Sequence, residues 1–183
     1  MTKPTGWNAR TAISNLKAAP WKGHAWRFHG RRYDAIDSAG SRLVSGRYNR
    51  GSDQFPEAEV WAALYLALRA EVALGEIVRH IFPDLLPKLN DFRLSELDVE
   101  LQIVLDCRDA PTLGLEHDDL VRDYDFEVTQ ELATEAVAGD AEGMLVPSAT
   151  QLGDNLIVFP ARLLANSRLV VVDTRDPRLY VQR

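Results

Sequence analysis

The apolar segments of this chain are short, and their periodicity changes from one segment to the next, which limits the possible folds most strongly. Residues 60–68 are nearly all apolar, so their periodicity alone fits a buried strand or a buried helix. We expect a strand that ends near Ala67. In residues 69–81 the apolar side chains fall on one face at helical spacing, which predicts a helix that ends before Pro83. A strand followed by such a helix favours an α/β fold of the α+β type.

Further strands are expected where short runs of β-branched and aliphatic residues lie between turn residues. They are residues 24–29, 92–99 and 101–107 (or one long bent strand through both), 143–146, 155–159 and 169–172. The acidic residues 117–138 predict one or two surface helices ending near Gly139, and residues 173–178 predict a tail.

No internal repeat or linker composition divides the chain. We therefore predict one compact domain over residues 24–183, preceded by a lead-in segment over residues 1–23. Trp7 and Trp21 are expected to pack this lead-in against the domain.

Charge and composition exclude several classes of function. The chain of 183 residues has 27 acidic and 21 basic residues, so nucleic-acid phosphates would be repelled. No apolar run reaches the ~18 residues of a membrane span. Cys107 is the single cysteine, and the four histidines lack zinc-site spacing, so we expect no disulfide and no metal. These features predict a cytoplasmic protein without a direct nucleic-acid or membrane partner.

Common catalytic and nucleotide-binding motifs are missing. Ser148 lies in Val-Pro-Ser-Ala-Thr and lacks the flanking glycines of a hydrolase nucleophile elbow. Neither the Gly-rich dinucleotide fingerprint nor the phosphate-binding Gly-Lys-Ser/Thr loop occurs. A nucleotide would therefore have to be bound mainly by side chains.

Five polar residues stand where apolar patterns break, and side chains at strand ends and loops can converge there. They are Arg27, Arg47, Tyr65, Glu76 and Ser148. Each one has an ordinary structural explanation: a surface ion pair for the arginines, a satisfied core hydroxyl for the tyrosine, a helix flank for the glutamate and a turn for the serine.

Taken in order, these residues and their neighbours resemble the RES-domain family, named for an arginine, a glutamate and a serine. The resemblance covers residues 26–178 through Trp-Arg, Gly-Arg-Tyr-Asn, Leu-Tyr-Leu-Ala, Val-Pro-Ser-Ala and Gly-Asp-Asn-Leu-Ile-Val-Phe-Pro. Studied members are bacterial toxins of toxin–antitoxin pairs that destroy NAD+. The resemblance implies a single compact domain similar to ADP-ribosyltransferases, with a mixed, strongly bent sheet and flanking helices around a nucleotide cleft.

The resemblance also implies roles for individual residues. Arg27 and Arg47 would bind the pyrophosphate or the nearby ribose, since a guanidinium matches phosphate oxygens. Tyr65 would lie beside the nicotinamide ribose, Glu76 would face its anomeric carbon, and Ser148 would hydrogen-bond the substrate. Glu76, Arg47 and Tyr65 are thus the expected catalytic residues. Tyr48, where relatives often have Trp, and Asn155 of the Gly-Asp-Asn motif complete the expected NAD+ contacts, while Ser45 stands where a second Gly is common.

The expected reaction breaks the nicotinamide–ribose bond through an oxocarbenium-like transition state. Nicotinamide leaves as a neutral molecule from a cationic ring, so one carboxylate can suffice. Phosphate as acceptor gives an NAD+ phosphorylase, water gives a glycohydrolase, and a protein side chain gives an ADP-ribosyltransferase. We favour phosphate or water. NAD+ would be a substrate and no prosthetic group is expected.

A helix-turn-helix (Xre-type) antitoxin is the expected protein partner, and a homodimer is possible. The alternatives are a catalytically idle binding or scaffold member of the family and an unrelated nucleotide-binding domain.

Overall fold

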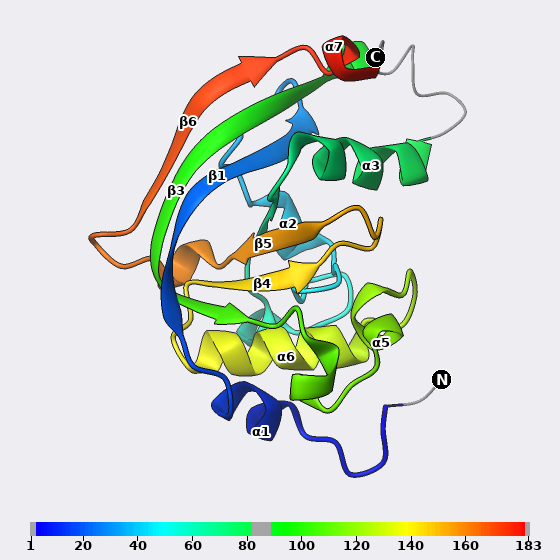
Figure 1. Cartoon of the computed structure of the whole chain (residues 1–183), viewed down its shortest axis with the longest axis vertical. Coiled ribbons are helices and arrows are strands. Elements are labelled where there is room, and N and C mark those ends of the chain that lie inside the picture. Colours follow the sequence, from blue (N-terminus) through cyan, green and yellow to red (C-terminus); the bar gives the residue numbers. More distant parts are fainter. Residues whose placement is uncertain (1–2, 82–88, 182–183) are drawn as a thin grey trace.

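The computed structural model describes residues 3–81 and 89–181, including their side chains except at residues 76–81 and 181. Its centre is one six-stranded, strongly curved sheet. The strands are β1 (Ala19–Gly30), β2 (Leu64–Ala67), β3 (Phe92–Asp106), β4 (Gly143–Pro147), β5 (Asp154–Val158) and β6 (Arg168–Arg175). Figure 1 shows β1, β3 and β6 as long arcs that curve side by side, with β4 and β5 on their concave side. Of the two alternatives for residues 92–107, the single long strand is correct.

The strand order β1-β2-β5-β4-β3-β6, with an added pairing between β1 and β3, closes five strands into a ring. β3 and β4 are parallel, whereas the other pairs are antiparallel. The predicted mixed, bent sheet is thereby confirmed. β6 extends the ring by pairing with β3.

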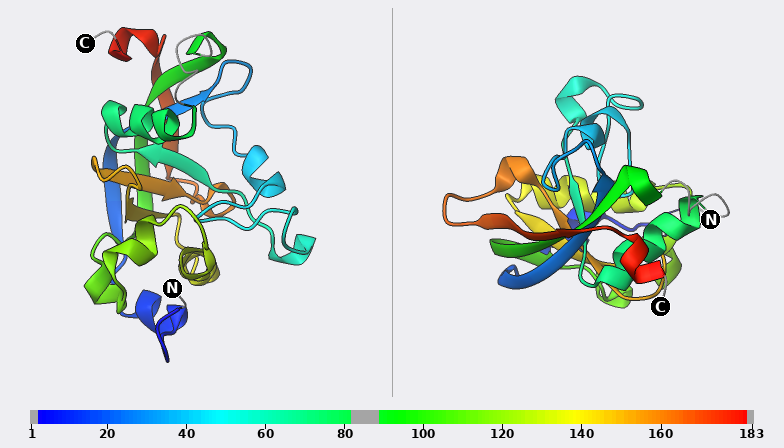
Figure 2. Two further views of the ribbon diagram at one scale, coloured as in Figure 1. Left: turned by 90° about the vertical axis from the view of Figure 1, so that its right-hand side faces the viewer. Right: turned by 90° about the horizontal axis from the view of Figure 1, so that it is seen from above.

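Helices lie around this ring. They are α1 (Ala9–Ser14), α2 (Gly40–Leu43), α3 (Ala70–Ile81), α5 (His117–Val121), α6 (Glu127–Ala138) and α7 (Arg178–Val181), with short 3-10 turns at Glu57–Glu59, Leu89–Asp91, Ala110–Leu113 and Pro160–Arg162. Figure 2 shows that the segment with α2 and the first of these turns projects away from the sheet.

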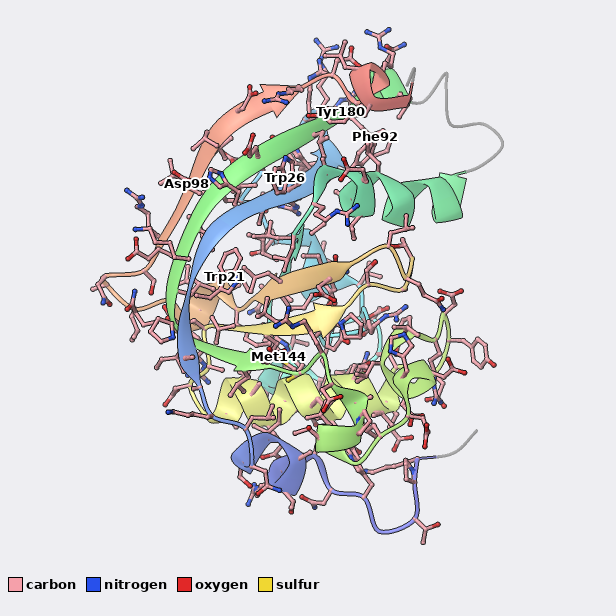
Figure 3. The ribbon with its side chains drawn as sticks, in the orientation of Figure 1. Trp21, Trp26, Phe92, Asp98, Met144 and Tyr180 are labelled. Carbon is pink, nitrogen blue, oxygen red and sulfur yellow. The ribbon has the colours of Figure 1, made fainter. Side chains whose placement is uncertain are left out.

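Apolar side chains pack on both faces of the sheet, and those on the outer face hold the helices. Inside the ring, the side chains of Ala25, Leu97 and Leu156 are completely buried. On the outer face, Trp26 packs in the cluster under α3, and Met144 packs in the cluster under α6. Figure 3 labels Trp26 beside the α3 end of β1 and Met144 above α6.

The predicted helix over residues 69–81 and the two strands that flank the 147–154 loop are confirmed. The helices predicted over residues 117–138, ending near Gly139, are confirmed as α5 and α6. α6 is more deeply covered than expected of a surface helix, because Leu132, Ala133 and Ala136 have no exposed area. The predicted tail is wrong, since residues 173–175 belong to β6 and α7 follows. β6 gave a weak sequence signal because most of its side chains are exposed, and an exposed strand needs fewer apolar residues.

The N-terminal segment lies against the helical layer. The Asn8 side chain caps α1, and the Trp7 indole N–H donates a hydrogen bond to the Leu113 carbonyl at 2.8 Å. β1 begins at Ala19, inside the segment expected to be a lead-in, and Trp21 packs against the core within the ring.

Cys107 follows β3 and has no exposed surface. Burial, with a smaller effect of Asp106, raises the pKa of its thiol to about 12. No helix among the described residues has the length and apolar content needed to cross a bilayer.

Candidate functional site

A cavity of about 310 Å³ opens on the outer face of the sheet, between α3 and the segment joining α5 to α6. Its walls are largely aromatic: Trp26, Phe28, Tyr48, Tyr65 and Phe126 all line it. Arg47 and Asp123 are the charged side chains among the lining residues, and Asn155 adds an amide. A ligand with a flat ring and a negative charge suits these walls.

Arg47 is carried by a tight turn from Gly46 to Asn49, which a backbone bridge closes. The Gly46 N–H donates to the Asn49 carbonyl at 3.2 Å. From α6, the amide nitrogen of Gln130 donates to the carbonyls of Gly46 and Asn49 at 2.9 and 3.3 Å. The turn is therefore fixed from inside the molecule, and a fixed turn holds its side chain in one place.

The hydroxyl of Tyr65 fastens the same turn. It accepts a hydrogen bond from the Tyr48 N–H and donates one to the Asn49 side-chain oxygen, both at 2.8 Å. Burial raises the pKa of Tyr65, although the Tyr48 N–H and Arg47 act in the opposite direction, so the hydroxyl stays protonated at neutral pH. The ring of Tyr65 lines the cavity while its hydroxyl supports Arg47's turn.

Two glycines allow this close packing. A Cβ on Gly46 would lie 2.6 Å from the Asn49 side-chain oxygen and 2.9 Å from the Tyr65 hydroxyl. A Cβ on Gly51 would lie 2.5 Å from the backbone nitrogen of Ser45. Steric constraints therefore explain why both ends of the Gly-Arg-Tyr-Asn-Arg-Gly segment are glycine.

The side chain of Arg47 is mostly buried, with 15% of its surface exposed. One nitrogen donates to the Leu120 carbonyl at 3.0 Å, and another lies 3.8 Å from a carboxylate oxygen of Asp123. The group also lies over the Phe126 ring, 5.4 Å from its centre. This leaves a largely desolvated positive charge in the wall of the cavity, where an anion is bound more strongly than in water.

Arg27 is placed differently. Side chains alternate along a strand, so Arg27 points to the opposite face of β1 from Trp26 and Phe28. One of its guanidinium nitrogens donates to the carbonyls of Ala35 and Asp37, at 2.7 and 2.6 Å. Burial lowers the pKa of Arg27, against the effects of the nearby carboxylates. Arg27 is not among the residues that line the cavity, so its predicted contact with the pyrophosphate stays a prediction.

Ser148 is fully buried, and its neighbours in the chain, Pro147 and Ala149, line the cavity. Its hydroxyl lies 2.8 Å from the Thr150 hydroxyl and accepts the Thr150 N–H at 3.1 Å. These bonds shape the loop between β4 and β5. Its predicted contact with the substrate also remains untested.

Glu76 lies on α3, and its side chain is outside the described residues. α3 borders the cavity through Ala73, one turn before Glu76. A Cβ on Gly75 would lie 3.2 Å from Leu152, so this glycine lets the 148–153 loop pack closely against α3.

The cavity brings together four of the predicted site residues: Arg47, Tyr48, Tyr65 and Asn155. Sequence reasoning missed Trp26, Phe28, Asp123 and Phe126 as lining residues. Trp26 and Phe28 alternate with Arg27 along one strand, so the prediction that placed Arg27 in the site directed these two side chains away from it. Asp123 and Phe126 belong to the acidic region, in which no motif marked them. Among the described residues, no three His, Cys, Asp or Glu side chains are grouped as metal ligands would be.

The RES domain family model matches residues 24–181. The chain belongs to the RES domain family. Among curated proteins, the NAD(+) phosphorylases MbcT of Mycobacterium tuberculosis and Mycobacterium bovis are similar to it. Each is 30% identical over 142 residues, which cover 73% of this chain and 71% of the relative. The crystal structure of the M. tuberculosis MbcT-MbcA toxin-antitoxin complex contains a similar fold, with a TM-score of 0.80, 26% identity and 95% of both chains covered.

Proposed function

We propose that this RES-domain chain breaks the nicotinamide–ribose bond of NAD+, with inorganic phosphate as the acceptor. The observation that carries the proposal is the position of Arg47, a desolvated guanidinium in an aromatic cavity, in a chain similar to an NAD(+) phosphorylase. Pockets for small molecules hold roughly 300–1,000 Å³. The cavity of about 310 Å³ is therefore large enough for one half of a dinucleotide.

In this reaction Arg47 binds the pyrophosphate, and the aromatic walls hold the nicotinamide ring. The nicotinamide of NAD+ is cationic, and a cation over an aromatic face is stabilised. Tyr48, Tyr65 and Asn155 are proposed to contact the nicotinamide riboside. These contacts lie away from the bond that breaks, and they hold the ribose in one orientation. Such positioning accelerates the reaction.

The bond changes balance without an added proton. An oxygen of phosphate forms a bond to the anomeric carbon while the carbon–nitrogen bond breaks. The electron pair of that bond neutralises the pyridinium nitrogen, so nicotinamide leaves uncharged and ADP-ribose 1-phosphate remains. Glu76 is proposed to stabilise the positive charge that develops on the ribose.

We also propose that the fold is related to that of ADP-ribosyltransferases. The mixed, bent sheet, with a cavity at its helix-covered face, supports this relationship. A reaction on NAD+ would act on the cytoplasmic pool. The M. tuberculosis relative forms a toxin-antitoxin complex. We therefore propose that an antitoxin of helix-turn-helix type keeps this chain inactive in the cell.

The test is a product analysis with purified protein and NAD+, with and without phosphate. We expect free nicotinamide together with ADP-ribose 1-phosphate, in amounts that rise with phosphate concentration. Equal release of ADP-ribose in phosphate-free buffer would make water the acceptor, and transfer of ADP-ribose to protein would make the chain a transferase. A lack of nicotinamide under all conditions would rule out the proposal.

A second experiment tests the role in the cell. Expression of the wild-type chain should stop growth and lower total NAD+, and Glu76→Gln should relieve both effects. Normal growth and unchanged NAD+ with well-expressed wild-type protein would contradict the toxin assignment.

A further inference from the structure

A second cavity, also of about 310 Å³, adjoins the first. The two share Asp123 and Ala149 in their walls. The second cavity is formed by α5 and the segment after it on one side and by the 148–153 loop on the other. Together they form a two-part space whose junction lies beside Arg47, since Asp123 is 3.8 Å from the Arg47 guanidinium.

The walls of the second cavity are built segments with defined backbone. Gln151 in the wall and Asp125, which follows the wall residue Tyr124, have positive φ angles of 58° and 60°, although neither is glycine. Such backbone is strained and persists where the surroundings enforce it. Here the side chain of Arg122 pairs with Asp119 and Asp125, and the Arg122 and Asp119 side chains are only 13% and 10% exposed.

The lining chemistry of the second cavity differs from that of the first. Tyr124 contributes a ring that is 74% exposed, and Asp118 and Asp123 contribute carboxylates. Arg122 also lines this cavity, but its mostly buried guanidinium is paired with Asp119 and Asp125. Carboxylates repel phosphates but accept hydrogen bonds from ribose hydroxyls and from the amino group of a base. An exposed aromatic ring offers a stacking surface for a base. These walls suit an uncharged nucleoside.

The two cavities also differ in their relation to α3. Ala73 of α3 lines the first cavity, and no described residue of α3 lines the second. Because the proposed reaction needs the helix that carries Glu76 near the nicotinamide ribose, the nicotinamide half belongs in the first cavity. The pyrophosphate then lies at the junction, beside Arg47.

We propose that the second cavity is the adenosine subsite, where Tyr124 stacks on the adenine and Asp118 or Asp123 accepts hydrogen bonds from the nucleoside. This inference rests on the proposed function and adds to it the direction in which NAD+ lies. It makes Tyr124 a specificity residue for dinucleotides over mononucleotides.

The experiment measures binding of two ligands that the enzyme cannot consume. ADP-ribose carries the adenosine, whereas ribose 5-phosphate has a ribose and a phosphate without it. Calorimetric titration of Tyr124→Ala should show about tenfold weaker binding of ADP-ribose and unchanged binding of ribose 5-phosphate. Tyr124→Phe retains the stacking ring and should bind ADP-ribose as the wild type does.

Tyr33→Ala is the matched control, because Tyr33 is a comparably exposed tyrosine, at 65%, that lines neither cavity. The proposal is overturned if Tyr124→Ala binds ADP-ribose normally, if Tyr33→Ala is equally affected, or if the wild type does not bind ADP-ribose. Kinetics separate this result from the proposed function. Nicotinamide release by the wild type together with an unchanged KM for NAD+ in Tyr124→Ala would retain the activity and reject the subsite.

Discussion

Arg27 and Arg47 belong to the same set of motifs, and the resemblance to the RES-domain family assigns both to the phosphates of NAD+ or the nearby ribose. The regions around them differ in what the guanidinium meets. Arg27 lies on the opposite face of β1 from the cavity and binds two backbone carbonyls of the 31–39 segment. Arg47 stands on a turn fixed by Gln130 and Tyr65, and its guanidinium lines the cavity. A buried cation with backbone acceptors holds a loop in place, whereas one that lines a cavity can bind a ligand.

The largest effect is expected for Arg47→Ala. Loss of a charge-assisted contact to phosphate costs about 1.5–3 kcal/mol, so kcat/KM for NAD+ should fall by roughly 10- to 100-fold. Arg47→Lys should recover only part of the loss, because an ammonium lacks the planar fork. Nicotinamide release is the measurement. Arg42→Ala, which removes an exposed arginine paired with Glu57, serves as the control. Full activity in Arg47→Ala would remove this residue from the site.

Arg27→Ala is expected to affect stability first. It removes the donor of two hydrogen bonds to the Ala35 and Asp37 carbonyls, at a cost of roughly 1–3 kcal/mol. For a chain of this size each kcal/mol lowers the Tm by about 2–4 °C. Thermal unfolding of Arg27→Ala and of Lys22→Ala, an exposed neighbour on β1, checks this. If Arg27→Ala kept its Tm and lost NAD+ binding, the contact expected from sequence would be established instead.

Gly46→Ala should disturb the turn under Arg47 by steric contact alone. The added methyl group would meet the Asn49 side-chain oxygen and the Tyr65 hydroxyl. A displacement of Arg47 by a fraction of an ångström should lower kcat/KM by about tenfold. Gly40→Ala is the matched control, since a Cβ there has no atom within 4 Å. Equal activity of both variants would show that the turn tolerates movement.

The smallest effect concerns His29, which lies on the same face of β1 as Arg27. Burial lowers the pKa of His29, and Arg27 lowers it further by charge repulsion. Because the folded pKa is below the unfolded value, this contribution to stability is present above about pH 6.5 and is lost as the pH falls through the folded pKa. Arg27→Ala should raise the pKa of His29 slightly in an NMR titration, and Arg47→Ala should leave it unchanged. A fall of the pKa in Arg27→Ala would contradict this assignment of charges.

Much of the fold could be predicted because its elements show simple periodicities. The helix α3 follows from its apolar stripe, and β4 and β5 follow from two short apolar runs around a turn-rich loop. The burial of α6 was underestimated because its acidic residues suggested a solvated helix. Its acids pair with the N-terminal segment, as Glu131 does with Lys3 and Glu135 does with Arg10, and its other side is buried.

The site could be predicted only in part, for a geometric reason. Period two places Trp26 and Arg27 on opposite faces of β1, but both faces are partly buried, one inside the ring and one under α3. The sequence does not say which face borders the cavity. Asp123 and Phe126 reach the cavity through the packing of α5 and α6, and local sequence carries no signal for such tertiary contacts.

The state of Cys107 has a practical consequence. It is the chain's single thiol, it is fully buried, and it resists ionisation. Maleimide chemistry requires an accessible thiolate, so the native protein should remain unlabelled. A cysteine introduced in place of Leu152, which is 54% exposed and follows Gln151 of the second cavity, would then be the sole reactive thiol. A fluorophore attached there would report the arrival of a nucleotide at the adjoining cavities in real time.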